Sequence, residues 1–227
     1  MFMFFQPTLS EHPFLEESDA KHCLRVLRKR RGDVIGVLDG RGHQYVCEIV
    51  SDKLPICEVR ILDRLEKKRL AAREVHVGIA PTKNPDRLEF LVEKCAEMGV
   101  ASIHLVVTDH SERRSQKLDR LEKIAISALK QSYQPWLMEI AGPVDLLTWI
   151  HQVTGQRLIA HLSETALPIS EVTLEEKVTL LVGPEGDFSI REIETVKQSG
   201  WTNVLLGNAR LRTETAGLVG ASWLTLK

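Results

Sequence analysis

The stretch LVGPEGDFSIREIE, residues 181–194, joins an apolar run to a segment that carries the marks of a helix start. Ser189 is a good N-cap residue, and Glu192 stands three residues later, which completes a capping box. Phe188 and Ile193 occupy the positions of a hydrophobic staple across the same helix start. The sequence therefore predicts a strand, a short loop and a well-specified helix in this order.

The loop itself, residues 183–187, has the sequence GPEGD. In open α/β sheets, ligands bind at the carboxyl edge of the strands, where this loop would lie, and its two glycines would let the backbone approach a ligand closely. The sequence matches neither GxxxxGK[ST] nor GxGxxG. Glu185 and Asp187 would repel a phosphate at a helix N-terminus and suit a cation or sugar hydroxyls better. A tight strand-to-helix turn without a ligand is the alternative reading of this segment alone.

A second loop of the same kind follows the next apolar strand, in LLGNARLRTETAGLVG, residues 205–220. Adjacent parallel strands would place both loops at one edge of the sheet. Thr213 as an N-cap and Glu214 in the first turn would explain two of its polar residues. Arg212 and Thr215 remain unexplained by capping, which favours a ligand site.

The composition is that of a soluble globular protein: 227 residues, 43% hydrophobic and 27% charged, with a net charge of −1. No apolar run reaches the roughly 20 residues that a membrane helix needs, and the apolar N-terminus reads as a first strand, not a signal peptide. The four scattered cysteines indicate reduced core thiols, not a disulfide or zinc framework. Residues 1–73 carry the basic excess, densest in RVLRKRRGD, residues 25–33.

The predicted secondary structure differs between two regions of the chain. Residues 1–70 read as short strands with tight turns, such as the Asp-Gly turn at 39–42, which predicts a small β-barrel. One helix, capped by Ser18, is expected within it. From residue 74 on, strands alternate with amphipathic helices, which predicts a mostly parallel sheet covered by helices on both faces. The charged segment 63–74 is the expected boundary.

The two loops together resemble those of the SPOUT methyltransferases, and most closely those of the RsmE family, bacterial enzymes that methylate N3 of a uridine in 16S ribosomal RNA. The family's GPEGGFS-like and LGxRILRTETA-like signatures stand here as GPEGDFS (183–189) and LGNARLRTETA (206–216). The block from His22 to Gly42 and the block KNPDRLEFLVEKCAEMGVASIHLVVTDHSERRS (83–115) are also similar to family blocks. The resemblance spans nearly the whole chain.

This resemblance implies the architecture, the cofactor and the partners. The first domain, residues 1–70, would be a PUA-like RNA-binding β-barrel. The second, residues 74–227, would be a SPOUT α/β domain whose C-terminal part forms a trefoil knot and holds S-adenosylmethionine, without a metal. The partners would be 16S rRNA, in the assembled small ribosomal subunit, and a second copy in a cytoplasmic homodimer.

The resemblance also implies site residues. Arg212 would stabilise the uracilate oxygen, and Glu214 is a weaker candidate for the general base. The cofactor would be bound by His161, Leu162, Val182, Gly183, Pro184, Glu185, Gly186, Leu206, Gly207, Leu211, Thr213, Thr215 and Ala216. RNA would be contacted by Arg25, Arg28, Lys29, Arg30 and Arg31, and in the second domain by Arg113, Arg114 and Lys117.

Three departures from the family pattern stand out. Asp187 replaces the usual second glycine, which is tolerable because Asp takes left-handed conformations better than most residues. Residues 208–210 replace a Pro-Arg-Ile-like triplet, and QSYQP, residues 131–135, lacks an arginine that is common after QS. The alternatives are a SPOUT enzyme that acts on transfer RNA, an RNA-binding module without catalysis, and a nucleotide hydrolase, which the missing P-loop lysine disfavours.

Overall fold

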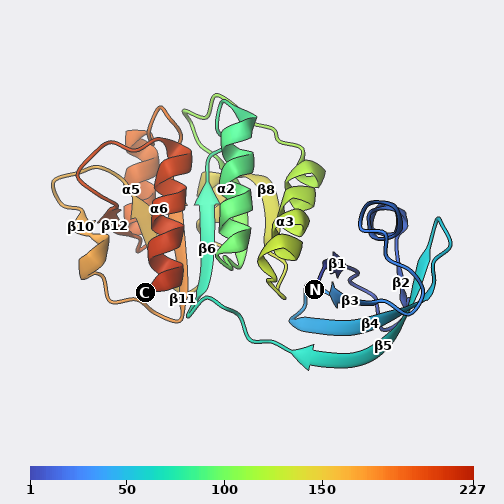
Figure 1. The fold of residues 1–227 in the computed structure, drawn as a ribbon. Coiled ribbons are helices and arrows are strands. Elements are labelled where there is room, and N and C mark those ends of the chain that lie inside the picture. Colours follow the sequence, from blue (N-terminus) through green and yellow to red (C-terminus); the bar gives the residue numbers. More distant parts are fainter. The chain divides into compact units, whose positions relative to one another are not determined.

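The protein is described here by a computed structural model that covers residues 1–227. The chain divides into two compact units, drawn in Figure 1. The first comprises Met1–Arg69 with Ile126–Leu137, and the second comprises Leu70–Ala125 with Met138–Lys227. The division falls close to the expected boundary, but the first unit also takes in Ile126–Leu137, a segment for which the sequence carries no signal of this kind.

The first unit is built on a curved, barrel-like sheet of five strands in the order β1-β3-β4-β5-β2. Only β1 and β3 run parallel, and the other neighbours are antiparallel. The elements are β1 (Met3–Phe5), β2 (Phe14–Leu15), α1 (Glu17–Lys21), the π-helix η1 (His22–Val26), β3 (Val34–Leu38), β4 (His43–Ser51) and β5 (Cys57–Glu66). The small β-domain predicted from the turn spacing is therefore present.

The turn at residues 39–42 takes the predicted hairpin form, with positive φ at Gly40 and Gly42. Asp39 stabilises it, because its carboxylate accepts hydrogen bonds from the backbone N–H groups of Arg41 and His43 at 2.8 and 3.1 Å. The strands on either side, β3 and β4, pair directly across this turn.

The helix expected in this unit differs from the prediction at its start and in its form. The N-cap position is Glu16, and no side chain caps it, so Ser18 is wrong as the cap and lies inside α1. The helix widens at residue 22 into a π-helical turn that ends with Val26. Arg28 follows in the left-handed region, with φ of 55°.

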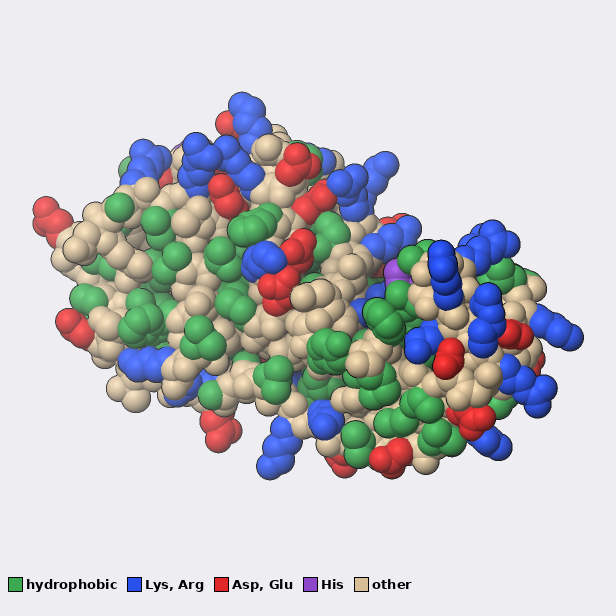
Figure 2. Space-filling view, viewed as in Figure 1, with side chains coloured by type: hydrophobic (Ala, Val, Ile, Leu, Met, Phe, Trp, Pro, Cys, Tyr) green, Lys and Arg blue, Asp and Glu red, His purple; other side chains and the backbone are tan.

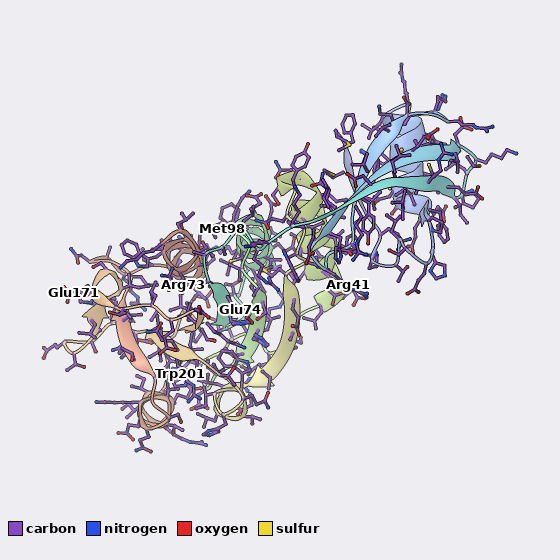
Figure 3. The ribbon with its side chains drawn as sticks, turned by 90° about the horizontal axis from the view of Figure 1, so that it is seen from below. Arg41, Arg73, Glu74, Met98, Glu171 and Trp201 are labelled. Atoms are coloured by element: carbon purple, nitrogen blue, oxygen red, sulfur yellow. The ribbon has the colours of Figure 1, made fainter.

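The second unit contains a seven-stranded sheet in the order β10-β12-β9-β11-β6-β7-β8, and all its pairings are parallel. Its strands are β6 (Glu74–Ile79), β7 (Ser102–Val107), β8 (Glu139–Asp145), β9 (Gln156–Ala160), β10 (Leu167–Pro168), β11 (Lys177–Val182) and β12 (Thr202–Leu205). Figure 3 labels Glu74 at the start of β6 and Trp201 just before β12. The predicted parallel sheet is confirmed.

Helices cover both faces of this sheet, as predicted. They are α2 (Pro85–Glu97), α3 (Leu118–Ser132), α4 (Leu146–Trp149), the 3-10 turn η2 (Ile169–Glu171), α5 (Ile190–Gln198) and α6 (Thr213–Leu226). Consecutive residues of a strand point to opposite faces. Leu181 packs with Trp149 of α4 and Val196 of α5, whereas its neighbour Leu180 lies against Gly220 of α6. So α4 and α5 cover one face, and α6, which packs against α2, covers the other.

Two glycines let α6 lie close to the sheet. A Cβ atom on Gly220 would stand 2.1 Å from a methyl carbon of Leu180, and one on Gly217 would stand 3.0 Å from a methyl carbon of Ile79. A larger residue at Gly220 would push α6 away from β11 and so move the loop that precedes the helix.

The chain threads through one of its own loops at the C-terminal side of this sheet. The segment between β9 and β11 carries β10, which pairs with β12 on the side away from β9. The chain enters β12 from α5 on one face and leaves it for α6 on the other. This is the threading that a trefoil knot requires. Knots are rare, and nothing in the hydrophobic periodicity announces one.

The four cysteines are buried free thiols, as predicted. No helix of the structure is both long enough and apolar enough to span a lipid bilayer.

Candidate functional site

A cavity of about 290 Å³ opens at the carboxyl ends of β9, β11 and β12. It brings the two loops singled out in the sequence to one place, as the parallel sheet requires. The lining residues are Ala160, His161, Leu162, Val182, Gly183, Pro184, Glu185, Asp187, Val204, Leu205, Leu206, Gly207, Ala209, Arg210, Leu211, Arg212, Thr213 and Ala216. Most of the wall is aliphatic side chain and backbone.

Most of the predicted cofactor-binding residues therefore lie around this cavity. Gly186 and Thr215 are the exceptions, since neither lines it. Of the two catalytic candidates, Arg212 lines the cavity and Glu214 does not.

The first loop, residues 183–187, is held in a tight turn in which the backbone N–H of Asp187 donates to the carbonyl oxygen of Pro184 at 3.1 Å. Asp187 itself has φ of 63°, the left-handed conformation that its place in a glycine position requires. Gly183 packs under Phe188, because an added Cβ would come within 2.8 Å of the Phe188 ring.

The capping box predicted for the following helix is present, and it also binds a second loop. Ser189 accepts from the backbone of Glu192, and the Glu192 carboxylate accepts from the Ser189 backbone at 2.8 Å. The other oxygen of Glu192 accepts from the backbone N–H of Asp109 at 2.8 Å. The Ser189 hydroxyl in turn donates to the Asp109 carboxylate at 2.6 Å. Glu192 is 2% exposed, so its buried carboxylate connects the loops after β7 and β11 by hydrogen bonds.

Further anchors come from the segments that follow β6 and β7. The His110 Nδ1 lies 3.1 and 3.0 Å from the carbonyl oxygens of Gly186 and Asp187. The backbone N–H of Lys83 donates to Glu185 at 3.2 Å. The ammonium group of Lys83 pairs with Glu112, and this hydrogen bond raises the pKa of Lys83 above its ordinary value. The Glu185 carboxylate, which belongs to the cavity lining, thus already accepts a hydrogen bond from the backbone of Lys83.

The second loop is fastened to the first at two points. Thr213 donates from its hydroxyl to the carbonyl oxygen of Gly183 at 3.0 Å, and Arg210 donates to the carbonyl oxygen of Glu185 at 3.4 Å. The interpretation of Thr213 as the N-cap of the last helix is wrong, because α6 begins at Thr213 and Arg212 holds the N-cap position without a capping side-chain bond. Thr213 instead connects the two loops.

Arg212 and Glu214 differ in their surroundings. The Arg212 side chain is exposed at the cavity and forms no hydrogen bond or ion pair. The Glu214 side chain is only 12% exposed, and one of its oxygens lies 3.6 Å from the Nε of Arg87 on α2. Its other oxygen is buried without a hydrogen-bond partner. A free guanidinium at the cavity can therefore stabilise a negative charge that develops on a bound ligand.

The basic run of the first unit projects from η1 and the loop that follows it, where Lys and Arg side chains gather in Figure 2. Arg25, Arg28 and Arg31 are exposed. Arg30 also has a structural role, because it donates to the carbonyl oxygens of Leu24 and Lys29, both at 3.1 Å.

In the second unit, the predicted RNA-contacting residues follow β7. Arg113 donates to the carbonyl oxygen of Ser115 at 3.0 Å, and Arg114 donates to that of Asp109 at 3.4 Å. Lys117 is exposed. The three residues belong to the loop after β7, which is hydrogen-bonded to Glu192, so they lie on the same edge of the sheet as the cavity.

Sequence reasoning missed several residues of the site. Ala160, Val204, Leu205, Ala209 and Arg210 line the cavity, and Lys83, Asp109 and His110 anchor its first loop. One signal was available: all of these residues stand at or just after the carboxyl ends of predicted parallel strands, where ligand loops gather.

Comparisons with known proteins agree with this architecture. A family model described as an RNA methyltransferase domain matches residues 69–225, and one described as an RNA methyltransferase PUA domain matches residues 15–62. The chain is 31% identical to ribosomal RNA small subunit methyltransferase E of Aquifex aeolicus over 207 residues, which cover 89% of each protein.

Solved structures agree as well. A probable rRNA-methyltransferase from Porphyromonas gingivalis superposes with a TM-score of 0.94 at 36% identity, over 99% of this chain and 98% of that one. A Legionella pneumophila protein solved with the cofactor SAM bound superposes with a TM-score of 0.88 at 27% identity, over 99% and 96% of the two chains. The threaded sheet, the two fastened loops and these matches together show that the chain belongs to the RNA methyltransferase family that includes ribosomal RNA small subunit methyltransferase E.

Proposed function

We propose that the protein transfers a methyl group from S-adenosylmethionine to N3 of a uridine in 16S ribosomal RNA. The observation that carries this proposal is the unpaired Arg212 guanidinium at a cavity built from the two signature loops. Relatives named ribosomal RNA small subunit methyltransferase E support the substrate, and the Legionella pneumophila structure with bound SAM supports the cofactor.

The cavity lining fits this cofactor. Ala160, Val182 and Leu206 offer apolar surface for an adenine ring, and the backbone of Gly207 and Leu211 is within the lining to hydrogen-bond its edge. The lining contains no lysine, and its Asp, Glu and Arg residues are Glu185, Asp187, Arg210 and Arg212. Glu185 and Asp187 suit the hydroxyl groups of a ribose and a positive sulfonium. The cofactor supplies an activated methyl group, and the protein supplies position and electrostatics.

The chemistry at the acceptor needs a negative charge on uracil. The N3 nitrogen is a weakly acidic imide, which must lose its proton before or during attack on the methyl carbon. Arg212 stabilises the oxygen of the uracilate that forms, as other fixed cations stabilise developing oxyanions. Glu214 is the neighbouring acid, but its carboxylate lies outside the cavity lining. The charge-stabilising role of Arg212 therefore carries the proposal, and Glu214 stays the weaker candidate for the base.

The substrate would be 16S rRNA in the assembled small subunit, in the cytoplasm. The exposed arginines of residues 25–31 would contact its phosphates through the first unit, and Arg113, Arg114 and Lys117 would do so beside the cavity. The target uridine would be unstacked to reach the methyl carbon.

An exposed apolar surface supports a homodimer. Phe90 on α2 is 49% exposed, and Val219, Trp223 and Leu226 on α6 are 37%, 37% and 80% exposed. The α6 residues recur at helical spacing on one side of the helix, and α2 packs beside α6. Figure 2 shows hydrophobic side chains gathered over these two helices. A surface of this kind, continuous over two neighbouring helices, is suited to a second copy of the chain.

The test is to map uridine N3 methylation on 16S rRNA from cells with and without this gene, and to assay the purified protein on small subunits and on transfer RNA. Methylation of small subunits that depends on the gene is the expected result. Labelled product found only in transfer RNA would overturn the choice of substrate, and absence of heat on titration with S-adenosylmethionine would favour a binding-only module.

A further inference from the structure

An indole ring in the first unit lies beside chain segments that carry four cations, away from the basic run. We call this group the Trp136 cluster; it consists of Arg41, Lys67, Lys68, Arg69 and Trp136. Figure 3 labels Arg41, which lies in the turn between β3 and β4. Trp136 comes from the distant segment Ile126–Leu137 that belongs to this unit. The four cations are exposed and form no ion pair.

The indole ring is fixed by backbone contacts. Arg41 and Trp136 form an isolated β-bridge, and the Trp136 Nε1–H donates to the carbonyl oxygen of Lys67 at 3.0 Å. The backbone N–H of Lys67 donates to the carbonyl oxygen of Gly42 at 2.8 Å. The ring lies so close to Gly42 that an added Cβ would stand 2.4 Å from one of its carbons. These contacts hold the ring and the chain after β5 in one arrangement.

Arg69 lies over this fixed ring. Its guanidinium carbon is 4.6 Å from the centre of the indole, within the range of a cation–π contact. The Arg69 side chain is exposed and no carboxylate pairs with it. The contact therefore places a planar cation on the surface, and a guanidinium plane of this kind can stack on a nucleobase.

A second arginine beside the cluster has a similar setting. The Arg64 guanidinium lies 6.0 Å from the centre of the Tyr45 ring, and it donates to the Nε2 of His43 at 2.7 Å. Because Nε2 accepts this bond, the His43 Nδ1 carries the proton, and it donates to Asp39 at 2.7 Å. Asp39 is thus engaged within its own turn and forms no ion pair with the cations of the cluster.

The Trp136 cluster is separate from the basic run. Lys67 directly follows β5 and the cluster adjoins the His43 end of β4, where His43 pairs with Glu66. The basic run instead joins the other part of β4, because Gly32 donates to the carbonyl oxygen of Ile49 at 2.8 Å. From His43 to Ile49 is roughly 20 Å along a strand at about 3.3 Å per residue. The two basic surfaces could therefore contact different parts of one RNA.

We infer that the Trp136 cluster binds a single-stranded segment of the RNA substrate. An unstacked base lies on the Arg69 guanidinium, which the indole ring supports from the other side, and Arg41, Lys67 and Lys68 contact the flanking phosphates. Aromatic rings combined with cations are the usual platform for single-stranded nucleic acid. This inference rests on the proposed function, because it assigns a further contact to the same RNA substrate.

The experiment measures binding of the full-length protein to an oligouridine RNA of about eight nucleotides and to an abasic oligomer of the same length and charge. Wild-type protein should bind the oligouridine more tightly than the abasic oligomer. Arg69→Lys, which keeps the charge but loses the planar group, should lower oligouridine affinity by about tenfold and leave abasic binding within about twofold. Trp136→Phe tests the support under the guanidinium and should lower the same affinity by a smaller factor.

The control variant is Lys197→Ala, which removes an exposed, unpaired cation from the last turn of α5 in the other unit. It should leave both affinities unchanged. Equal binding of the two oligomers by wild-type protein, or an Arg69→Lys variant that binds oligouridine as wild type does, would overturn the inference. So would tighter binding of an acidic peptide than of oligouridine.

The same variants separate this inference from the proposed function. If wild-type protein methylates small subunits and Arg69→Lys does so with an unchanged KM for subunits, the inference about the Trp136 cluster is wrong and the proposed function stands. If wild-type protein methylates neither small subunits nor transfer RNA, the proposed function fails, whatever the oligomer affinities are.

Discussion

The Nδ1 atom of His161 lies 3.2 Å from the Oδ1 atom of Asp187. This contact joins the loop after β9 to the loop after β11 at the wall of the cavity, which both residues line. The same Asp187 oxygen accepts from the backbone N–H of Phe188 at 2.8 Å. The residue that replaces the family's usual glycine thus keeps the left-handed backbone of a glycine and adds a side-chain connection to His161.

Asp187→Ala should therefore destabilise the loop in two ways. A β-carbon without a local hydrogen bond is disfavoured in the left-handed region by about 1–2 kcal/mol, and the contact with His161 is lost. Asp187→Asn is the matched control, because Asn tolerates the left-handed region and keeps an amide oxygen. Denaturant unfolding should show a loss of about 1–2 kcal/mol for Ala and a much smaller loss for Asn. Equal stability of the two variants would contradict this account of Asp187.

Glu192 should be the residue on which the order of the loop after β11 depends most. Glu192→Ala removes a buried carboxylate that accepts from the backbones of Asp109 and Ser189, so about 3 kcal/mol of unfolding free energy should be lost. Calorimetric titration should also show weaker binding of S-adenosylmethionine, since the loop lines the cavity. Glu192→Gln keeps an oxygen acceptor and should lose clearly less. A Glu192→Ala variant as stable as Glu192→Gln would show that these hydrogen bonds contribute little to the unfolding free energy.

The order of the longer elements could be predicted because local chemistry marks them, whereas the short β2, β10 and η2 were not predicted. Gly99, which has a positive φ, follows the end of α2, and the capping box marks the start of α5. The association of Ile126–Leu137 with the first unit could not be predicted, because it depends on contacts such as the Arg41–Trp136 bridge between residues far apart in sequence.

The two loops of the site could also be predicted from local sequence, but not all of their contacts could. The two loops carry their glycine and polar residues in sequence, so their meeting at one edge follows from a parallel sheet. Thr213 shows the limit: its local pattern is that of an N-cap, but its hydroxyl donates to Gly183, thirty residues earlier. A capping rule reads only neighbours in sequence and cannot detect such a bond.

His104 should make stability depend on pH. Burial lowers the pKa of His104 and nearby His76 lowers it further, whereas Glu139 acts in the opposite direction. The unfolded chain, with an ordinary histidine pKa of about 6.5, then binds a proton more readily than the folded one. Unfolding free energy should therefore fall as the pH drops below about 6.5, until the pH passes the lowered folded pKa. Denaturant unfolding between pH 5 and 7.5 should show this slope, and His104→Gln should reduce it.

The control for this pH dependence is the exposed His151, also in the second unit. His151→Gln should leave the slope of wild-type protein in place. A slope that is the same in wild type and His104→Gln would remove His104 as its source.

The apolar surface on α2 and α6 should hold two copies of the chain together. Trp223→Glu introduces a charge there, and sedimentation equilibrium should show a shift from dimer to monomer. Ile190→Glu is the matched control, because Ile190 is 78% exposed at the start of α5 on the opposite face of the sheet. A wild-type protein that sediments as a monomer would contradict the homodimer. Dissociation of both variants would show that the effect is not specific to the surface on α2 and α6.

The central claim, that Arg212 stabilises the negative charge on the uracil, is tested most directly by methyl transfer to small subunits with Arg212→Ala. The turnover number should fall by about 100-fold, with S-adenosylmethionine affinity within about twofold of wild type by calorimetry, and Arg212→Lys should retain an intermediate rate. Wild-type turnover by Arg212→Ala at saturating substrate, with the cofactor bound normally, would contradict the claim.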